Sequence, residues 1–317
     1  MQKIRVGVAG AGHLGYHHAR NYALLPDVTL AGVADIQEEK RAKAADDFKA
    51  PGVPDIQSLL ALGVDAVSVA TPSTTHCDVV MELLEAGVHI LVEKPMAPTL
   101  AEAERMVAAA REKNLVLQVG HIERFNGAVM AVMESFSKPK FIECHRLSPY
   151  PMRGADVSVV LDLMIHDLDI VLAMEPGKIE WLDAAGTPIF SESEDIANVR
   201  IRFASGCVAN ITSSRVSVDR MRKIRIFAEN AYVATDYSAQ EVLVYRKKPG
   251  PIPPGENPME HISIEPLAVR KEEPLKLELE SFVNCVREGL RPVVSGEDGL
   301  KAVRLAEQIQ AYIREHL

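Results

Sequence analysis

The sequence predicts an α/β protein in which a doubly wound parallel sheet is followed by an α+β domain with an open, mostly antiparallel sheet. Three observations support this: a glycine motif at 10–15 between a strand-like and a helix-like segment, apolar runs that alternate with helical segments up to residue 120, and alternating polar and apolar positions afterwards. Parallel strands buried on both faces are apolar throughout, whereas half-exposed antiparallel strands alternate. We expect a first domain at 1–120 and a second at 121–317, whose last helices could pack back on the first.

The first domain is expected to open with a strand, a helix and a second strand, at 4–9, 14–24 and 28–34. Further apolar runs predict buried strands, and segments with helical periodicity separate them. These strands are expected at 65–70, 88–92 and 115–119, and the helices at 77–86 and 100–113. Thr99, followed three residues later by Glu102, matches a capping box at the start of the last helix.

The second domain is expected to contain a helix at 159–174 and several half-exposed strands. The strands are predicted at 199–203, 207–213, 223–228, 232–236 and 242–245, and closing helices at 275–288 and 299–317. The proline- and glycine-rich segment 248–255 is predicted to be a loop.

The glycine motif Gly10-Ala11-Gly12-His13-Leu14-Gly15 lies where the first strand should end and the first helix begin. N–H groups at such a helix start can face a diphosphate, so the pattern predicts dinucleotide binding. Asp35 lies twenty residues after Gly15, where an acid that binds ribose belongs. A carboxylate there favours NAD over NADP, although Lys40 and Arg41 follow it and could reach a 2′-phosphate.

Composition indicates a globular cytoplasmic protein. The chain has 317 residues, of which 47% are hydrophobic and 25% charged, and it has no apolar stretch near the roughly 18 residues that a membrane span needs. The net charge of −9 argues against a broad nucleic-acid surface. Four scattered cysteines without a CxxC spacing predict reduced thiols.

Three side chains are candidates for the chemistry. Lys94 directly follows an apolar strand, where it could bind an oxygen that changes between alcohol and carbonyl. Asp162 and His166 are four residues apart, so one helix face would hold both, and the histidine could take a hydroxyl proton. A zinc site built on this pair would need a third ligand from a histidine far away in the sequence, and no metal is expected.

Four motifs in this order resemble the glucose-fructose oxidoreductase and inositol dehydrogenase (Gfo/Idh/MocA) family along essentially the whole chain. They are Ala9 to Gly15, Ala70-Thr71-Pro72-Ser73 with His76, Glu93-Lys94-Pro95-Met96-Ala97, and Asp162 with His166-Asp167-Leu168-Asp169. The resemblance implies a Rossmann domain and hydride transfer between a nicotinamide and a ring carbon of a sugar or polyol. It implies catalytic roles for Lys94, Asp162 and His166. Implied cofactor contacts are Gly10, Gly12, His13, Leu14, Gly15, Asp35, Ile36, Thr71, Pro72, His76, Glu93 and Lys94.

Residues 120–126 and 162–169 look like the branch that oxidises nucleotide-linked amino sugars, the UDP-N-acetylglucosamine 3-dehydrogenases. Gly127 stands where many relatives have proline, which affects a turn rather than the chemistry. Candidate substrate contacts are His121, Arg124, Asn126 and Arg153. For a diphosphate the sequence offers Arg153, Arg215 and Arg222 without choosing among them.

The resemblance leads us to expect NAD-dependent oxidation of a ring hydroxyl, at C3, of a UDP-N-acetylhexosamine in amino-sugar and lipid A precursor synthesis. His166 would be the base, oriented by Asp162, and Lys94 would bind the reacting oxygen; the roles of Lys94 and His166 could also be exchanged. One alternative is a dehydrogenase of a free polyol or sugar, and another is a non-catalytic NAD-binding sensor. Apolar positions on the exposed sheet face predict a homodimer or homotetramer.

Overall fold

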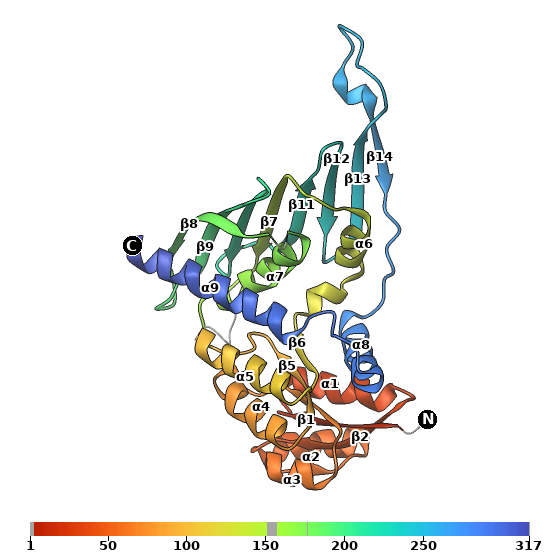
Figure 1. Ribbon diagram of the computed structural model, residues 1–317, viewed down its shortest axis with the longest axis vertical. Helices are drawn as coiled ribbons and strands as arrows, with labels where there is room; N and C mark the ends of the chain where they lie inside the picture. The colour runs from red at the N-terminus through yellow and green to blue at the C-terminus, as the bar shows by residue number, and fades with distance from the viewer. Residues whose placement is uncertain (1–2, 151–156, 176, 317) are drawn as a thin grey trace. The chain divides into compact units, whose positions relative to one another are not determined.

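The computed structural model describes residues 3–150, 157–175 and 177–316 (Figure 1). It divides into two compact units. The first comprises Met1–Phe125 and Glu273–Arg304, and the second comprises Asn126–Glu272 and Leu305–Leu317. The last helix, α9 (Gly296–His316), contributes its beginning to the first unit and its remainder to the second.

The first unit contains a parallel six-stranded sheet in the order β3-β2-β1-β4-β5-β6. This order defines a doubly wound Rossmann sheet and confirms the predicted fold class. The strands are β1 (Ile4–Ala9), β2 (Val28–Ala34), β3 (Gly52–Val53), β4 (Ala66–Val69), β5 (His89–Glu93) and β6 (Leu117–Gly120). The helices are α1 (His13–Leu24), α2 (Glu38–Phe48), α3 (Ile56–Ala61), α4 (His76–Glu85), α5 (Leu100–Glu112) and α8 (Pro274–Glu288).

The core of this unit joins α1 and α8 although 249 residues of chain separate them. Tyr22 of α1 and Phe282 of α8 are both fully buried in one apolar cluster, together with Val6 of the central strand. Burial of each such side chain stabilises the fold by roughly 1.5–3 kcal/mol. The C-terminal segment therefore completes the core of the N-terminal sheet.

The predicted capping box is present at the start of α5. The Thr99 hydroxyl accepts from the Glu102 backbone N–H at 3.3 Å and donates to the Glu102 carboxylate at 2.7 Å. The bond satisfies one of the N–H groups that a helix start leaves without an intrahelical partner.

The second unit contains an eight-stranded sheet in the order β14-β13-β12-β11-β7-β10-β9-β8, in which only β7 and β10 pair in parallel. Helices α6 (Gly127–Ser135) and α7 (Ile165–Met174) cover one face (Figure 1). The strands are β7 (Phe141–Leu147), β8 (Ile179–Thr187), β9 (Ile196–Phe203), β10 (Val208–Ser214), β11 (Met221–Phe227), β12 (Ala231–Asp236), β13 (Glu241–Lys247) and β14 (Ile262–Pro266). The open, mostly antiparallel sheet is confirmed, and β7, β8 and β14 are strands that the sequence analysis missed.

The predicted helix at 159–174 is not one regular helix. A π-helical turn, η3 (Val160–Met164), precedes α7. The Ser158 hydroxyl accepts from the Leu161 N–H at 3.4 Å and from the Gln310 side chain at 2.7 Å. Because the Gln310 contact comes from a distant part of the chain, no local periodicity signals it. Single π turns are frequent at functional sites, and this one contains Asp162.

Candidate functional site

The glycine loop between β1 and α1 has room for a ligand at one position and none at the other two. Gly10 has φ +93°, and a Cβ there would lie 2.7 Å from the Ala70 carbonyl oxygen. A Cβ on Gly15 would lie 1.7 Å from the Gly10 carbonyl oxygen. A Cβ on Gly12 would meet nothing within 4 Å. Gly10 and Gly15 therefore let the loop fold, whereas Gly12 leaves open space beside it.

The N-terminus of α1 lies directly after Gly12, the N-cap residue, which supplies no side-chain cap. The first N–H groups of a helix have no intrahelical partner and carry the positive end of its dipole. His13 and Leu14 in this turn are exposed. The loop and helix start can thus hold a diphosphate.

Asp35 lies at the end of β2, and its carboxylate is held by backbone groups. One oxygen accepts from the Ala11 N–H at 2.7 Å and the other from the Gln37 N–H at 2.8 Å. A hollow of about 570 Å³ lies beside it, lined by Gly10, Gly12, Asp35, Ile36, Lys40, Thr71 and Pro72 among others. Ile36 is 87% exposed and offers an apolar surface for an adenine.

Lys40 and Arg41 differ in their relation to this hollow. Lys40 lines it, whereas the Arg41 guanidinium donates to the carbonyl oxygens of Asp35 and Ile36, at 3.3 and 3.2 Å. Of these two basic residues, Lys40 is therefore the one placed to meet a 2′-phosphate. The hollow, the open Gly12 and Asp35 together fit a dinucleotide.

His76 supports the loops around the cofactor hollow from within the protein. The side chain is 1% exposed, with Nδ1 3.0 Å from the Pro95 carbonyl oxygen and Nε2 2.9 Å from that of Thr71. Burial lowers the pKa of His76 despite these two carbonyls, which act to raise it. We therefore assign His76 to the support of Thr71 and Pro95 rather than to contact with the cofactor.

Glu93 and Lys94 lie at the carboxyl end of β5, and the Lys94–Pro95 peptide is cis. The Glu93 carboxylate turns into the protein, where one oxygen lies 2.9 Å from His18 Nε2 and the other accepts from the Lys94 N–H at 3.2 Å. Burial acts to raise the pKa of Glu93, but the hydrogen bond from His18 and the charges of His18 and Lys94 outweigh it and lower this pKa. Glu93 therefore anchors the segment that carries Lys94.

The polar side chains of Asp162, His166, Asp167 and Asp169 in the second unit differ in how deeply they are buried. Asp162 and His166 are both half-buried, with solvent access on η3 and α7. Asp167 is 1% exposed and accepts two hydrogen bonds from the buried Arg146 guanidinium, at 2.8 and 3.0 Å. Asp169 is also buried. Asp162 and His166 are thus the members of the set that a substrate could reach.

The candidate substrate contacts are mostly engaged elsewhere. His121 is buried, and Arg124 donates to the Val293 carbonyl oxygen at 3.2 Å. Asn126 is 5% exposed; it accepts from the Ala128 N–H at the start of α6 and donates to the Tyr237 carbonyl. Asn126 is therefore the cap of α6, a role that the sequence analysis did not foresee, and its contact with a substrate stays a prediction. Arg153 lies outside the described residues.

Arg215, one of the three arginines predicted as candidate diphosphate ligands, is not available for that role. Its guanidinium is fully buried and donates to the Asp195 carboxylate at 2.8 Å and to the Ser191 hydroxyl at 2.8 Å. Burial acts to raise the pKa of Asp195, but hydrogen bonds from Ser191, Phe190 and Arg215 lower it well below its usual range. A guanidinium used in this way has a structural role. Arg222 lies on β11, exposed to solvent.

Comparisons with known proteins all match this chain to one family of oxidoreductases. Residues 4–121 match an oxidoreductase family with an NAD-binding Rossmann fold, and residues 127–234 match the GFO/IDH/MocA C-terminal domain. UDP-N-acetylglucosamine 3-dehydrogenase from Acidithiobacillus ferrooxidans is 34% identical over 100% of this chain and 99% of its own. The solved structure of that enzyme has a TM-score of 0.92 and 33% identity, with 99% of each chain covered. Myo-inositol 2-dehydrogenase from Thermotoga maritima is 26% identical over 98% of this chain and 97% of its own.

Proposed function

The chain belongs to the Gfo/Idh/MocA oxidoreductase family, and from this membership we propose that it oxidises the C3 hydroxyl of a UDP-N-acetylhexosamine with NAD. It is an oxidoreductase that acts on a CH–OH group, as its sugar and polyol dehydrogenase relatives are. The full-length 34% identity to a UDP-N-acetylglucosamine 3-dehydrogenase carries the choice of substrate.

The catalytic roles follow from the chemistry of three side chains. NAD, when bound, accepts the hydride from the carbon that is oxidised. His166 takes the hydroxyl proton, and Asp162, which shares its partly exposed position, orients the imidazole and favours its charged form. Lys94 donates to the reacting oxygen, whose partial negative charge grows as the proton leaves. The Glu93 carboxylate holds the Lys94 backbone in place.

The 3-keto nucleotide sugar is a substrate for amination. We therefore place the reaction before an aminotransferase in amino-sugar and lipid A precursor synthesis. From the composition of the chain we propose a cytoplasmic location. Among the described helices, none is long and apolar enough to cross a membrane.

NADH formation at 340 nm tests the proposed function. NAD is supplied with UDP-N-acetylglucosamine, UDP-N-acetylgalactosamine, UDP-glucose, myo-inositol or glucose, together with a carbonyl trap that draws the equilibrium forward. We expect turnover with UDP-N-acetylglucosamine and a 3-keto product by mass spectrometry. Turnover with a free polyol alone would replace this proposal with the inositol-type reaction, and NAD binding without turnover on any sugar would favour a sensor.

Asp35 is proposed to select NAD over NADP. An Asp35→Asn variant keeps an oxygen that can accept from the Ala11 or Gln37 N–H but loses the charge that repels a 2′-phosphate. We expect the NAD-to-NADP ratio of kcat/KM to fall by roughly 10–100-fold, as expected for loss of a charged hydrogen bond. Steady-state kinetics with both cofactors measures this, and an unchanged ratio would remove Asp35 from the selection.

The exposed face of the second sheet is proposed to join copies of this chain. Phe141, Phe227, Tyr232 and Tyr245 are register neighbours on four adjacent strands, and successive ring centroids lie 5.8, 4.8 and 5.0 Å apart. Phe227 is 38% exposed and the other three rings are half-buried, and an aromatic row that solvent can reach is typical of an interface.

A Phe227→Asp substitution tests this assembly because it places a charge in the middle of the aromatic row. We expect the wild type to sediment as a dimer or tetramer at micromolar concentration and the variant to dissociate. Val218→Asp is a control, since Val218 is 94% exposed and lies outside the strands. A monomeric wild type would contradict the proposal.

A further inference from the structure

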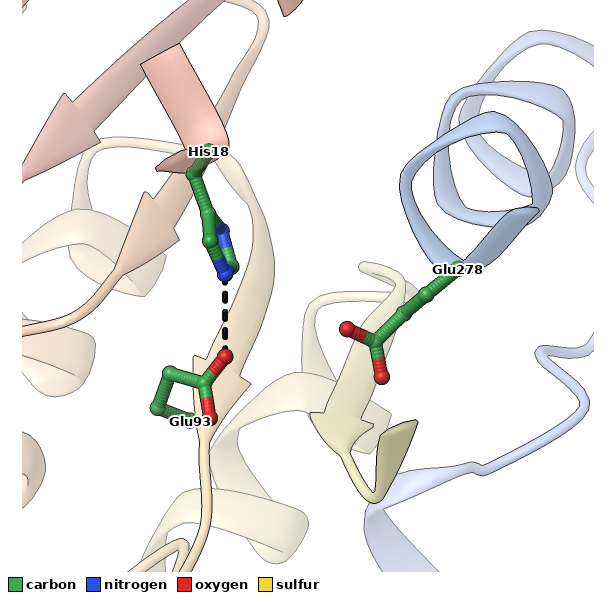
Figure 2. Close-up of side chains that lie close together, drawn as sticks. All are labelled: His18, Glu93 and Glu278. Atoms are coloured by element: carbon green, nitrogen blue, oxygen red, sulfur yellow. Dashed lines mark hydrogen bonds and ion pairs between the residues drawn. The ribbon is translucent and has the colours of Figure 1, made fainter. Parts of the chain in front are cut away.

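Three titratable side chains from distant parts of the first unit meet in its interior. His18 comes from α1, Glu93 from the end of β5 and Glu278 from α8 (Figure 2). Their closest ligand-type atoms all lie within 4.8 Å of one another. The proposed reaction uses Glu93 only as the anchor of Lys94 and does not use His18 or Glu278 at all.

Glu278 is the unusual member of this cluster. The side chain is fully buried, and neither carboxyl oxygen has a hydrogen-bond partner among the described residues. In Figure 2 its carboxyl group points from α8 towards His18 and Glu93. Burial, followed by the negative charge of Glu93, raises the pKa of Glu278 well above its usual range. Full burial, the absence of a hydrogen-bond partner among the described residues and the nearby Glu93 carboxylate all favour the protonated form of Glu278.

Glu93 has little freedom to adjust to a second charge. Its carboxylate is bound to His18 on one side and to the Lys94 N–H on the other. A Cβ added to Gly120 on the neighbouring strand would lie 2.9 Å from Glu93 Oε2, so the backbone of β6 packs closely against the carboxylate. A negative charge on Glu278 would act directly on the group that anchors Lys94.

We propose that Glu278 is a positioning residue, a buried neutral acid whose proton allows Glu93 to remain ionised between His18 and the Lys94 backbone. Loss of this proton would place two carboxylates in one buried pocket and displace Glu93. The kinetic part of the proposal rests on the proposed role of Lys94, whereas the protonation of Glu278 does not depend on it.

The other groups around Glu278 are consistent with this assignment. On α1, the Tyr22 hydroxyl is paired with Ser68 at 2.7 Å, and burial is the main cause that raises the pKa of Tyr22. On β6, the Gln118 side chain donates to the backbone carbonyl of Glu278 at 3.1 Å. The 3-10 turn η2 (Ile122–Phe125), which packs against α8, carries Glu123 and Arg124.

A divalent cation is the competing occupant, because one imidazole and two carboxylates form a plausible ligand set. Zinc binds such atoms at about 2.0–2.2 Å, which places neighbouring ligands roughly 3.4 Å apart. The spread of up to 4.8 Å in this cluster is wider, and His18 Nε2 already pairs with Glu93 at 2.9 Å. The geometry favours a proton over a metal ion.

Stability against pH gives the first test, with Glu278→Gln as the neutral isostere and Glu280→Gln on the same helix as a control. An acid whose pKa is raised by folding contributes stability that is present below its unfolded pKa of about 4.5 and is lost as pH rises through its folded pKa. The urea midpoint of Glu278→Gln should therefore rise relative to wild type from pH 5 to pH 9. Parallel pH curves for the variant and wild type would overturn the proposal, as would a midpoint that shifts with added Zn²⁺ or EDTA.

Turnover of a UDP-N-acetylhexosamine gives the second test. Glu278→Gln should keep kcat within about twofold of wild type at pH 7, with little change in the KM for NAD, and should resist the alkaline decline of the wild type. A Gln variant whose kcat falls with rising pH as the wild type's does would overturn the positioning role. If Lys94→Ala shows no kinetic defect, the proposed function of Lys94 fails, while the stability test still decides the protonation of Glu278.

Discussion

Replacement of Lys94 by alanine is expected to lower kcat for the nucleotide sugar by about 10²–10³-fold, because the reacting oxygen loses the donor that stabilises its developing charge. Replacement of His166 by alanine should cost about 10²–10⁴-fold through loss of the general base. NAD binding, followed by fluorescence titration, should be preserved in both variants, since the cofactor hollow is built from other side chains. Lys113→Ala, at the exposed end of α5, is the matched control.

The pH dependence of kcat/KM separates the two possible assignments of the base. A histidine base is inactive when protonated, so activity should rise with pH through the imidazole pKa, near ~6.5 for an unperturbed group. This rise should disappear in His166→Ala. If the rise in kcat/KM persists in His166→Ala, then Lys94 is the base and His166 binds the reacting oxygen. A Lys94→Ala enzyme with wild-type turnover would show that Lys94 has no part in the mechanism.

Substitutions at Asp167 and Asp162, five residues apart, are expected to have very different effects on the free energy of unfolding. Asp167→Ala leaves the Arg146 guanidinium, which is 3% exposed, without its bidentate partner. Breaking a buried ion pair in this way costs about 3–5 kcal/mol, so the free energy of unfolding should fall by that amount in urea titrations. Asp162→Asn should change it by less than about 1 kcal/mol, because Asp162 is half-buried, and should act on turnover instead.

A double substitution tests whether the unpaired charge of Arg146 causes the loss of stability in Asp167→Ala. Arg146→Met with Asp167→Leu removes both members of the pair, and replacing a buried pair with apolar side chains is often neutral or stabilising. Recovery of most of the lost stability in the double variant is expected. A single Asp167→Ala variant as stable as wild type would show that Arg146 has sufficient other partners.

The elements missed by the sequence analysis have identifiable physical causes. In β7 the inward positions are Ile142, Cys144 and Arg146, so a charged residue interrupts the expected apolar alternation. Its charge is tolerated because Asp167 pairs with it, and that partner comes from another element. β14 ends on a proline, which also weakens a strand pattern.

The glycine loop, the acid after β2, the alternation of strands and helices and the two sheet types could all be predicted from the sequence alone. These features depend on backbone conformations and side-chain periods that contiguous residues impose. The pairing of Asp167 with Arg146 and of Arg215 with Asp195, the capping role of Asn126 and the approach of Glu278 to Glu93 became visible only in the folded structure. Burial and charge pairing depend on which distant segments pack together, and the 184 residues between Glu93 and Glu278 contain no local signal of that contact.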